Sequence, residues 1–243
     1  MLTERQARAW NELGLGPLWV SRAPAPAAVA APRAQDAWPT IRAEVSDCRR
    51  CGLCQTRTKT VFGSGSQRAR WMLVGEAPGA EEDLSGEPFV GQAGRLLDQM
   101  LASIGLTRET DVFITNVLKC RPPGNRKPEP VEAETCSSYL YRQIDLLQPD
   151  LIVLLGRFAM QSVLGADANI ASLRQQVHHY TAAHGRIPVV CTYHPAYLLR
   201  NLPEKRKSWE DLCLALEVSA RQRELNPRPD EGSDDAGEPS ARG

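Results

Sequence analysis

The strongest constraint on the fold comes from three short apolar runs that alternate with segments of helical periodicity. The runs are RWMLVG at 70–75, VFITNV at 112–117 and LIVLLG at 151–156, each the length of a buried strand. Between them, residues 94–104 and 131–147 repeat apolar side chains every three to four positions, as amphipathic helices do. This βαβαβ order predicts an α/β fold with helices on both faces of a mostly parallel sheet. Ligands of such folds bind at the carboxyl ends of the strands.

Further elements extend this pattern toward the end of the chain. Residues 177–180 and 188–193, separated by a glycine, are predicted to form a second pair of strands, and residues 204–223 a closing helix. We therefore expect one structured domain over residues 41–223, long enough to bury its own core.

The two ends of the chain have a different composition. Residues 1–40 combine a short helical segment with a linker in which positions 23–37 hold eight alanines and three prolines. Residues 224–243 are rich in Pro, Gly, Asp, Glu and Ser, and we expect them to be disordered.

Composition and charge exclude some classes of protein. The longest apolar run, residues 151–155, is far shorter than the roughly 18 residues of a membrane-spanning helix. No export signal opens the chain, so we expect a cytoplasmic protein without a membrane partner. The 29 basic and 29 acidic residues cancel, but six basic residues and no acid occur in 48–75, and four more basic residues in 119–127. Such local clusters are typical of nucleic-acid contacts.

Four of the seven cysteines lie in these two basic segments, and a fifth follows the second segment. The four are Cys48, Cys51, Cys54 and Cys120, and the fifth is Cys136. An odd total in a reducing compartment argues against a disulfide framework and favours metal ligation or burial. A zinc ribbon needs a second C-x2-C, which is absent, and a ferredoxin run has a further cysteine where this chain has Thr58. A single iron–sulfur cluster held by four thiolates agrees with the spacing, which leaves the ligand set open.

Polar residues follow the predicted strands at positions where a ligand would bind. GEAPG at 75–79 and GEPFVG at 86–91 form a shaped loop, in which Phe89 is either a core anchor or a platform for a base. Asn116 ends the next strand, where its amide either has a structural role or presents a carbonyl and an NH2 group to a ligand. His194 ends the last strand before Pro195, and the apolar and basic residues after it suit a wedge into stacked bases.

Taken together, these motifs resemble the family 4 uracil-DNA glycosylases, the iron–sulfur branch of that superfamily. The resemblance rests on C-x2-C, FGSGS, GEAPGAEED, GEPFVGQAG, ITNVLKCRPPGNR and YHPAYLLRN in this order, and covers roughly residues 45–218. It implies a three-layer α/β/α fold with a four-stranded parallel sheet. It also implies a 4Fe-4S cluster with no redox step in catalysis, and excision of uracil from DNA at the start of base excision repair.

The resemblance also assigns residues. The implied cluster ligands are Cys48, Cys51, Cys120 and Cys136, with Cys54 outside the set. The implied uracil site contains Gly75, Glu76, Ala77, Glu82, Phe89, Asn116 and His194. Of these, Glu76 and His194 are implied to be catalytic, and Glu82 to crowd the C5 edge of the base.

The expected partner is uracil-containing DNA, single-stranded or duplex. Its implied contacts are Arg57, Lys119, Leu198, Leu199 and Arg200. Two rival hypotheses are an iron–sulfur electron carrier and a nucleic-acid-binding module without catalysis. The helical segment near the start of the chain is either a docking peptide for a protein partner or an inert extension.

Overall fold

The computed structural model describes residues 34–165 and 169–228. The predicted N-terminal helix, most of the Ala/Pro linker and residues 229–243 lie outside the described residues. From Ala37 onward the chain forms one structural unit, and the fold below is that of this unit.

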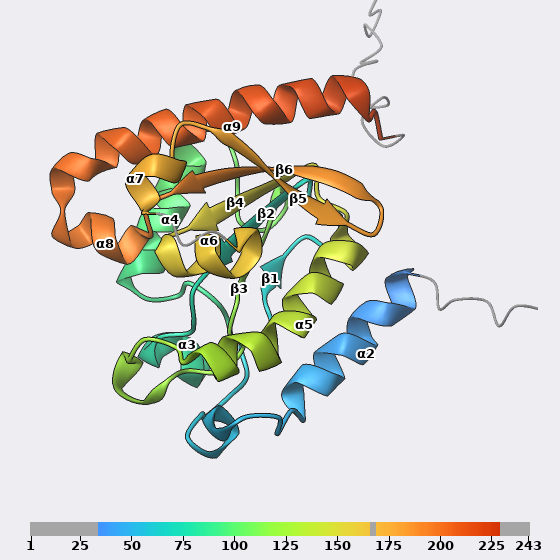
Figure 1. The fold of residues 1–243 in the computed structure, drawn as a ribbon, viewed down its shortest axis with the longest axis vertical. Coiled ribbons are helices and arrows are strands. Elements are labelled where there is room, and N and C mark those ends of the chain that lie inside the picture. Colours follow the sequence, from blue (N-terminus) through green and yellow to red (C-terminus); the bar gives the residue numbers. More distant parts are fainter. Residues whose placement is uncertain (1–33, 166–168, 229–243) are drawn as a thin grey trace, which may run out of the picture. The chain divides into compact units, whose positions relative to one another are not determined.

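The centre of the unit is a six-stranded sheet in the order β1-β3-β2-β4-β6-β5 (Figure 1). The strands are β1 (Ser64–Gly65), β2 (Trp71–Gly75), β3 (Val112–Asn116), β4 (Leu151–Leu155), β5 (Val177–Ala182) and β6 (Gly185–Thr192). The neighbours β3, β2, β4 and β6 are parallel, whereas β1 and β5 pair antiparallel at the two edges. The mostly parallel sheet is confirmed, but the expected four strands are its centre and not the whole sheet.

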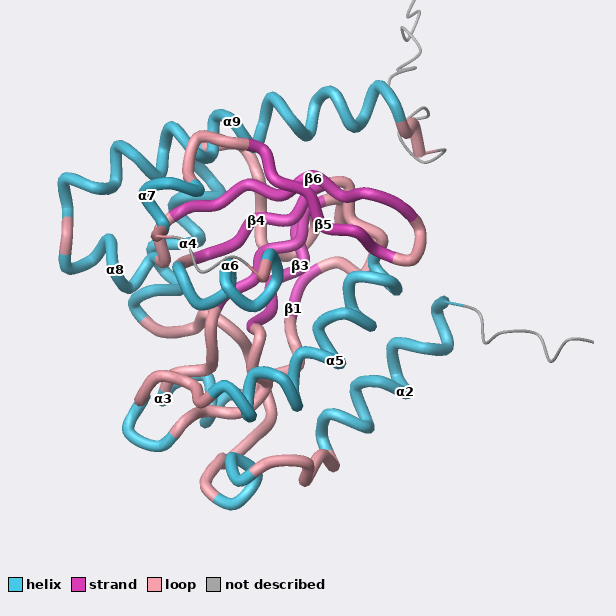
Figure 2. Tube along the Cα trace, in the orientation of Figure 1, coloured by secondary structure: helices cyan, strands magenta, loops and turns pink. Residues whose placement is uncertain are grey.

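Helices cover both faces of the sheet (Figure 2). They are α2 (Ala34–Ser46), α3 (Ala80–Ser85), α4 (Gln92–Ser103), α5 (Pro130–Leu147), α6 (Arg157–Leu164), α7 (Ile170–Leu173), α8 (Pro195–Arg200) and α9 (Lys205–Leu225). Side chains of α2, α5 and α6 pack in one core cluster, and those of α4 and α9 in a second. The predicted three-layer α/β/α class is therefore confirmed. No helix among the described residues is long and apolar enough to cross a bilayer.

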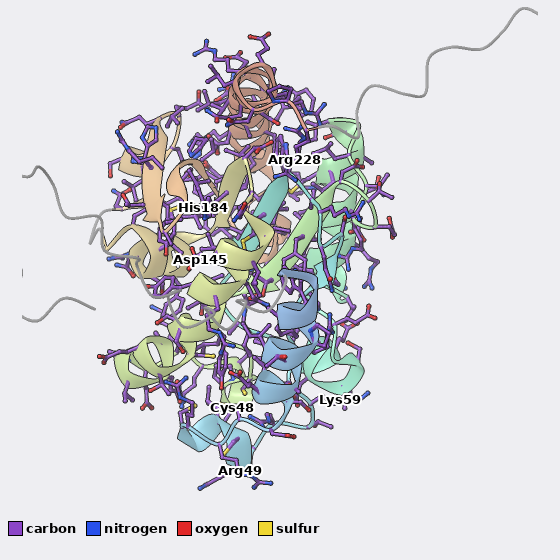
Figure 3. The ribbon with its side chains drawn as sticks, turned by 90° about the vertical axis from the view of Figure 1, so that its right-hand side faces the viewer. Cys48, Arg49, Lys59, Asp145, His184 and Arg228 are labelled. Atoms are coloured by element: carbon purple, nitrogen blue, oxygen red, sulfur yellow. The ribbon has the colours of Figure 1, made fainter. Side chains whose placement is uncertain are left out.

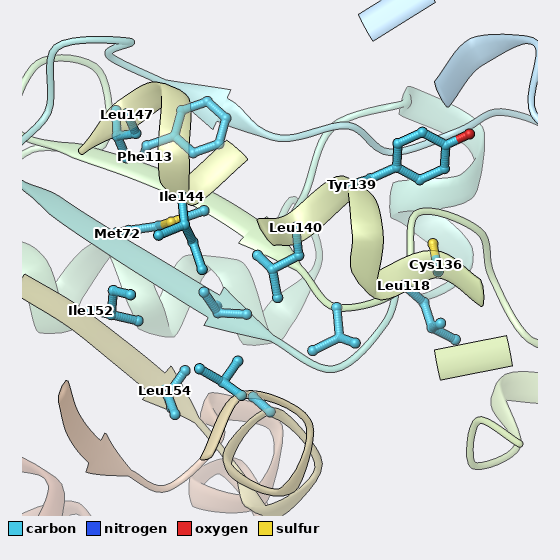
Figure 4. Packing of buried hydrophobic residues seen from close by; sticks show 14 of the residues in the cluster. Met72, Phe113, Leu118, Cys136, Tyr139, Leu140, Ile144, Leu147, Ile152 and Leu154 are labelled. Carbon is cyan, nitrogen blue, oxygen red and sulfur yellow. The ribbon is translucent and has the colours of Figure 1, made fainter. Parts of the chain in front are cut away.

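Alternate side chains of each parallel strand enter the two clusters. In β2, Met72 lies in the cluster with α5, where it appears beside Ile144 and Phe113 (Figure 4), whereas Trp71 and Leu73 lie in the cluster with α4. Because both faces of these strands are buried, their sequences are continuous apolar runs and do not alternate with polar residues.

The boundaries of the structured unit lie outside the expected ones. Helix α2 begins at Ala34, so the expected boundary at residue 41 falls inside it. The Trp38 ring is 3% exposed and lies 5.1 Å from the Phe113 ring, centroid to centroid. At the other end α9 continues to Leu225, and Arg228 donates hydrogen bonds to main-chain carbonyls. The composition did not indicate the start of α2, because the alanines and prolines before it are typical of a linker.

We predict that Trp38→Ala lowers the free energy of unfolding by about 3–5 kcal/mol, since it leaves a cavity between α2 and the sheet. Urea unfolding followed by circular dichroism measures this loss. Trp209→Ala on α9 is the matched control, because Trp209 is 45% exposed and its loss should change stability by about 0.5 kcal/mol or less. Equal effects of the two substitutions would show that α2 does not belong to the core.

Candidate active site

A cleft of about 680 Å³ lies at the carboxyl ends of the parallel strands. Its lining includes Glu76 after β2, Asn116 at the end of β3 and His194 after β6, together with Phe89 from the loop before α4. Side chains that are far apart in sequence therefore meet in one cavity, at the edge where the parallel topology places ligands.

Gly75, at the end of β2, lies directly against two residues that line the cleft. A Cβ atom at this position would lie 2.4 Å from Oδ1 of Asn116 and 2.6 Å from Cζ of Phe89. Only glycine leaves room for the amide and the ring together.

The amide of Asn116 is buried but incompletely bonded. Its side chain is 2% exposed, and among the described residues no donor reaches its Oδ1 atom. An unsatisfied buried acceptor costs about 1–3 kcal/mol, so native proteins seldom keep one without a purpose. In the wall of a cleft, it fits a ligand that brings an N–H donor.

Phe89 is held in an unusual backbone conformation. Its φ is +55°, in the left-handed region that bulky residues seldom adopt. Arg108 stabilises this turn, since its guanidinium donates to the carbonyls of Pro88 (3.2 Å) and Phe89 (2.7 Å). Gly94 allows it, because a Cβ there would lie 1.7 Å from the Phe89 oxygen. The ring packs in the core cluster, as an anchor does, and it also lines the cleft, so its role as a platform for a base stays a prediction.

His194 caps α8, and this fixes its tautomer. Its Nδ1 accepts a hydrogen bond from the Ala196 N–H (3.1 Å), so Nε2 carries the proton of the neutral ring. Burial, followed by the nearby charge of Arg200, lowers the pKa of His194 from 6.5 to about 4. The ring stacks against Phe89 with centroids 5.4 Å apart. At neutral pH it is therefore an uncharged donor in the cleft.

Two acidic residues of the first loop have different environments. Glu76 is half-buried, and burial raises the pKa of its carboxyl, with a smaller opposing effect from Lys127. Glu82 accepts hydrogen bonds from the main-chain N–H groups of Gly79, Val90 and Gly91 at 3.0–3.1 Å. It thereby closes residues 79–91 into one rigid loop and still lines the cleft.

Five thiols surround a second, small void behind the cleft. Its lining contains Cys48, Cys51, Cys54, Cys120 and Cys136, with Cys48 labelled near the end of the unit opposite Arg228 (Figure 3). Burial raises the pKa of Cys120 to about 11 and also raises that of Cys136. The Arg57 guanidinium donates to Sγ of Cys120 (3.1 Å), and the main-chain N–H of Lys119 to Sγ of Cys136 (3.3 Å).

This donor set fits an iron–sulfur cluster. Thiolates are the ligands of iron–sulfur clusters, and N–H groups directed at the sulfurs tune such clusters. The N–H groups of Arg57 and Lys119 are directed at sulfurs in this way. Four of the thiols come from two loops and the fifth, Cys136, from α5, and Cys54 lines the same void as the four implied ligands.

One of the predicted DNA contacts needs correction. Lys119 is 1% exposed, and its Nζ donates to Oγ1 of Thr115 (2.6 Å), the main-chain oxygen of Asn116 (2.7 Å) and Oε1 of Gln143 (2.6 Å), so it has no surface for a phosphate. Burial lowers its pKa to about 7. Arg57 is half-buried and donates to Cys120 and to the main-chain oxygen of Cys48 (2.7 Å), and its contact with DNA stays a prediction.

The predicted wedge is also only partly exposed. Leu198 is 1% exposed and packs inward from α8, whereas Leu199 and Arg200 are exposed. The neighbouring Tyr197 is 37% exposed and lines the cleft, although the sequence analysis did not single it out. Helical periodicity from Pro195 onward is the signal that separates the inward residue from the outward ones.

Comparisons with known proteins agree with this geometry. Residues 62–214 match the model of the uracil DNA glycosylase superfamily. The type-4 uracil-DNA glycosylase of Archaeoglobus fulgidus is 48% identical over 171 residues, 69% of this chain and 85% of the relative. This chain belongs to the type-4 uracil-DNA glycosylase family. The type-4 enzyme of Thermotoga maritima is 43% identical over 162 residues (66% and 82%), and a type-5 enzyme of Pyrobaculum aerophilum is 31% identical over 171 residues (64% and 73%).

The crowding at Gly75 predicts that a larger residue there impairs uracil excision. Gly75→Ala should displace the Asn116 amide and the Phe89 ring and reduce uracil excision about 100-fold or more, because a misplacement of about 1 Å has that effect on a catalytic arrangement. The unfolding midpoint should change little in comparison. Gly52→Ala is the control, since nothing lies within 4 Å of a Cβ at Gly52. Full excision by Gly75→Ala would mean that Asn116 and Phe89 do not contact the base.

Proposed function

We propose that this chain is a uracil-DNA glycosylase that hydrolyses the N-glycosidic bond of a deoxyuridine flipped out of DNA, at the start of base excision repair. One observation carries the proposal: the buried and unpartnered Oδ1 of Asn116 lies in a cleft whose wall includes Phe89 and His194. A planar base that brings an N–H donor satisfies this acceptor.

Base recognition follows from the chemistry of an amide. Asn116 accepts from N3–H of uracil and donates to its O4, whereas cytosine presents an acceptor and a donor at those positions. A buried site that must leave such groups unpaired rejects the wrong base strongly. Phe89 supplies a flat apolar surface for the ring. Glu82, which holds the loop, is proposed to crowd the C5 edge and exclude the methyl group of thymine.

Bond cleavage separates charge. The C1′–N1 bond breaks with its electron pair on uracil, whose O2 gains negative charge while the sugar becomes a cation. The neutral Nε2–H of His194 is proposed to donate to O2 and stabilise this anion. The carboxylate of Glu76 stabilises the sugar cation and accepts a proton from the water whose oxygen bonds to C1′. A raised pKa makes Glu76 a better proton acceptor than an exposed glutamate.

Cys48, Cys51, Cys120 and Cys136 are proposed to hold a 4Fe-4S cluster. When bound, this group would supply a fixed anchor between the two cysteine loops and α5, and no redox step. Leu199 and Arg200 are proposed to enter the space left by the flipped nucleotide, at a cost of a few kcal/mol in base stacking that DNA contacts offset. Free thiols suit a reducing compartment, so we place this activity in the cytoplasm.

The direct test is release of free uracil from an end-labelled oligonucleotide with one deoxyuridine, single-stranded and in a duplex. Matched oligonucleotides with cytosine or thymine at that position are the controls. We expect uracil from the first pair only. DNA binding without uracil release would favour the module without catalysis, and neither binding nor release would favour the electron carrier.

We predict that His194→Ala excises uracil about 10²- to 10³-fold more slowly in single turnover, because the charge on O2 develops in the transition state. Binding of uracil-containing DNA should change much less. His179→Ala is the control, since His179 is exposed on β5 and does not line the cleft. A folded His194→Ala protein with the rate of the wild type would exclude the histidine from the reaction.

The same assay over a range of pH tests the charge states. His194 with a pKa of about 4 is already neutral at pH 6.5, so the rate should show no inflection there. The rate should fall at lower pH, because the Glu76 carboxylate that the reaction needs becomes protonated. Since burial raises the pKa of Glu76, this fall should begin at a higher pH than for an exposed glutamate. An inflection near 6.5 that disappears in His194→Ala would mean that the charged imidazolium takes part.

For the cluster, we predict that Cys120→Ser loses the absorbance near 400 nm that cysteinyl iron–sulfur proteins show, together with most of its bound iron. Cys54→Ser should keep both. Iron and sulfide analysis of the two purified variants measures the difference. Loss of colour in Cys54→Ser alone would mean that the proposed ligand set is wrong and that Cys54 is a ligand together with Cys48 and Cys51, as in a ferredoxin run.

A further inference from the structure

The cleft carries a second aromatic pair that the mechanism above does not use. Tyr193 and Tyr197 both line the cleft, beside but separate from the stacked pair of Phe89 and His194. Tyr197 lies one turn of α8 beyond His194 and is 37% exposed. A large exposed aromatic ring in the wall of a cleft needs an explanation.

The ring of Tyr197 is the outermost member of a rigid stack. It lies on the ring of Tyr193 with centroids 5.0 Å apart and planes 22° from parallel. Tyr193 is buried, and the Arg174 guanidinium lies 4.9 Å from the centroid of its ring. Arg174 is fixed in turn by Asp211, which is fully buried and accepts at 2.7 and 2.9 Å. The stack therefore runs from the core to the cleft with little freedom.

This arrangement fits a base as ligand. The Tyr193 ring covers one side of Tyr197, and the exposure of Tyr197 leaves room for another flat ring. Every nucleobase has a flat π face, and stacking on an aromatic side chain does not depend on its sequence. Leu198 is buried and cannot provide this surface, whereas exposed Arg200 at the end of α8 can meet a phosphate.

We propose that Tyr197 is a stacking platform for the base next to the flipped uridine on the same strand. The inference rests on the proposed function, because it needs a nucleotide bound in the cleft. The proposed function assigns uracil to Asn116, Phe89 and His194, so a base on Tyr197 belongs to a neighbouring nucleotide. The platform keeps that base stacked after it has lost its contact with uracil, and so lowers the cost of flipping.

The test is a binding measurement on DNA that is not cleaved. A single-stranded oligonucleotide carries 2-aminopurine on one side of a 2′-fluoro-deoxyuridine, whose glycosidic bond resists hydrolysis, and a second oligonucleotide carries it on the other side. We expect the wild type to quench the fluorescence of one of the two. Tyr197→Ala should lose this quenching and bind about tenfold more weakly, in the range of one lost base–aromatic stack.

Tyr197→Phe keeps the ring and should restore both the quenching and the affinity. Trp209→Ala removes an exposed aromatic ring that does not line the cleft and should behave as the wild type does. With a cleavable substrate, Tyr197→Ala should raise the half-saturating DNA concentration far more than it lowers the maximal single-turnover rate.

Three results would overturn the platform. The first is wild-type quenching and affinity in Tyr197→Ala, and the second is equal losses in Tyr197→Phe and Tyr197→Ala. The third is that, in a duplex, only a 2-aminopurine opposite the uridine loses its fluorescence. The proposed function fails separately, if the wild type releases no uracil from the cleavable oligonucleotide. Quenching is read without cleavage, so the two failures are distinguishable.

Discussion

Lys119, whose amino group is buried, connects the cleft with the cysteine site. Burying a charged group costs several kcal/mol unless hydrogen bonds replace the lost water, and three oxygens here match the three N–H bonds of the protonated form. One of them is the main-chain oxygen of Asn116, the residue that we propose reads the base. The main-chain N–H of Lys119 donates to Sγ of Cys136. Asn116 and the cysteine site are therefore joined through one residue.

A second connection runs through the first loop. Asp83 in α3 is buried and accepts hydrogen bonds from the main-chain N–H groups of Thr58 (2.9 Å) and Lys59 (3.4 Å), just after the first cysteines. Its neighbour Glu82 closes the loop that carries Phe89. The cysteine site is thus connected with two walls of the cleft. In our proposal, a cluster held there would contribute mechanically, since it would hold the loops that shape the cleft.

Much of the fold and part of the site could be predicted from the sequence. The parallel strands are buried on both faces, so they appear as apolar runs, and topology alone then places Asn116 and His194 at one edge. Local sequence could not predict burial that tertiary contacts decide. Lys119 lies in a basic segment that is typical of DNA contacts, yet its oxygen partners come from a strand and a distant helix. Leu198 and Tyr197 are consecutive, and only the packing of a short helix shows which one is exposed.

The central claim is that the unpartnered oxygen of Asn116 accepts the N3–H of uracil. Protein labelled with ¹⁵N at asparagine, titrated with free uracil, tests it through the side-chain amide resonances, which Asn116→Ala assigns. We expect uracil to shift the Asn116 side-chain amide signal and 3-methyluracil, which has no N3–H, to leave it unchanged. An equal shift with 3-methyluracil, or none with saturating uracil, would contradict it.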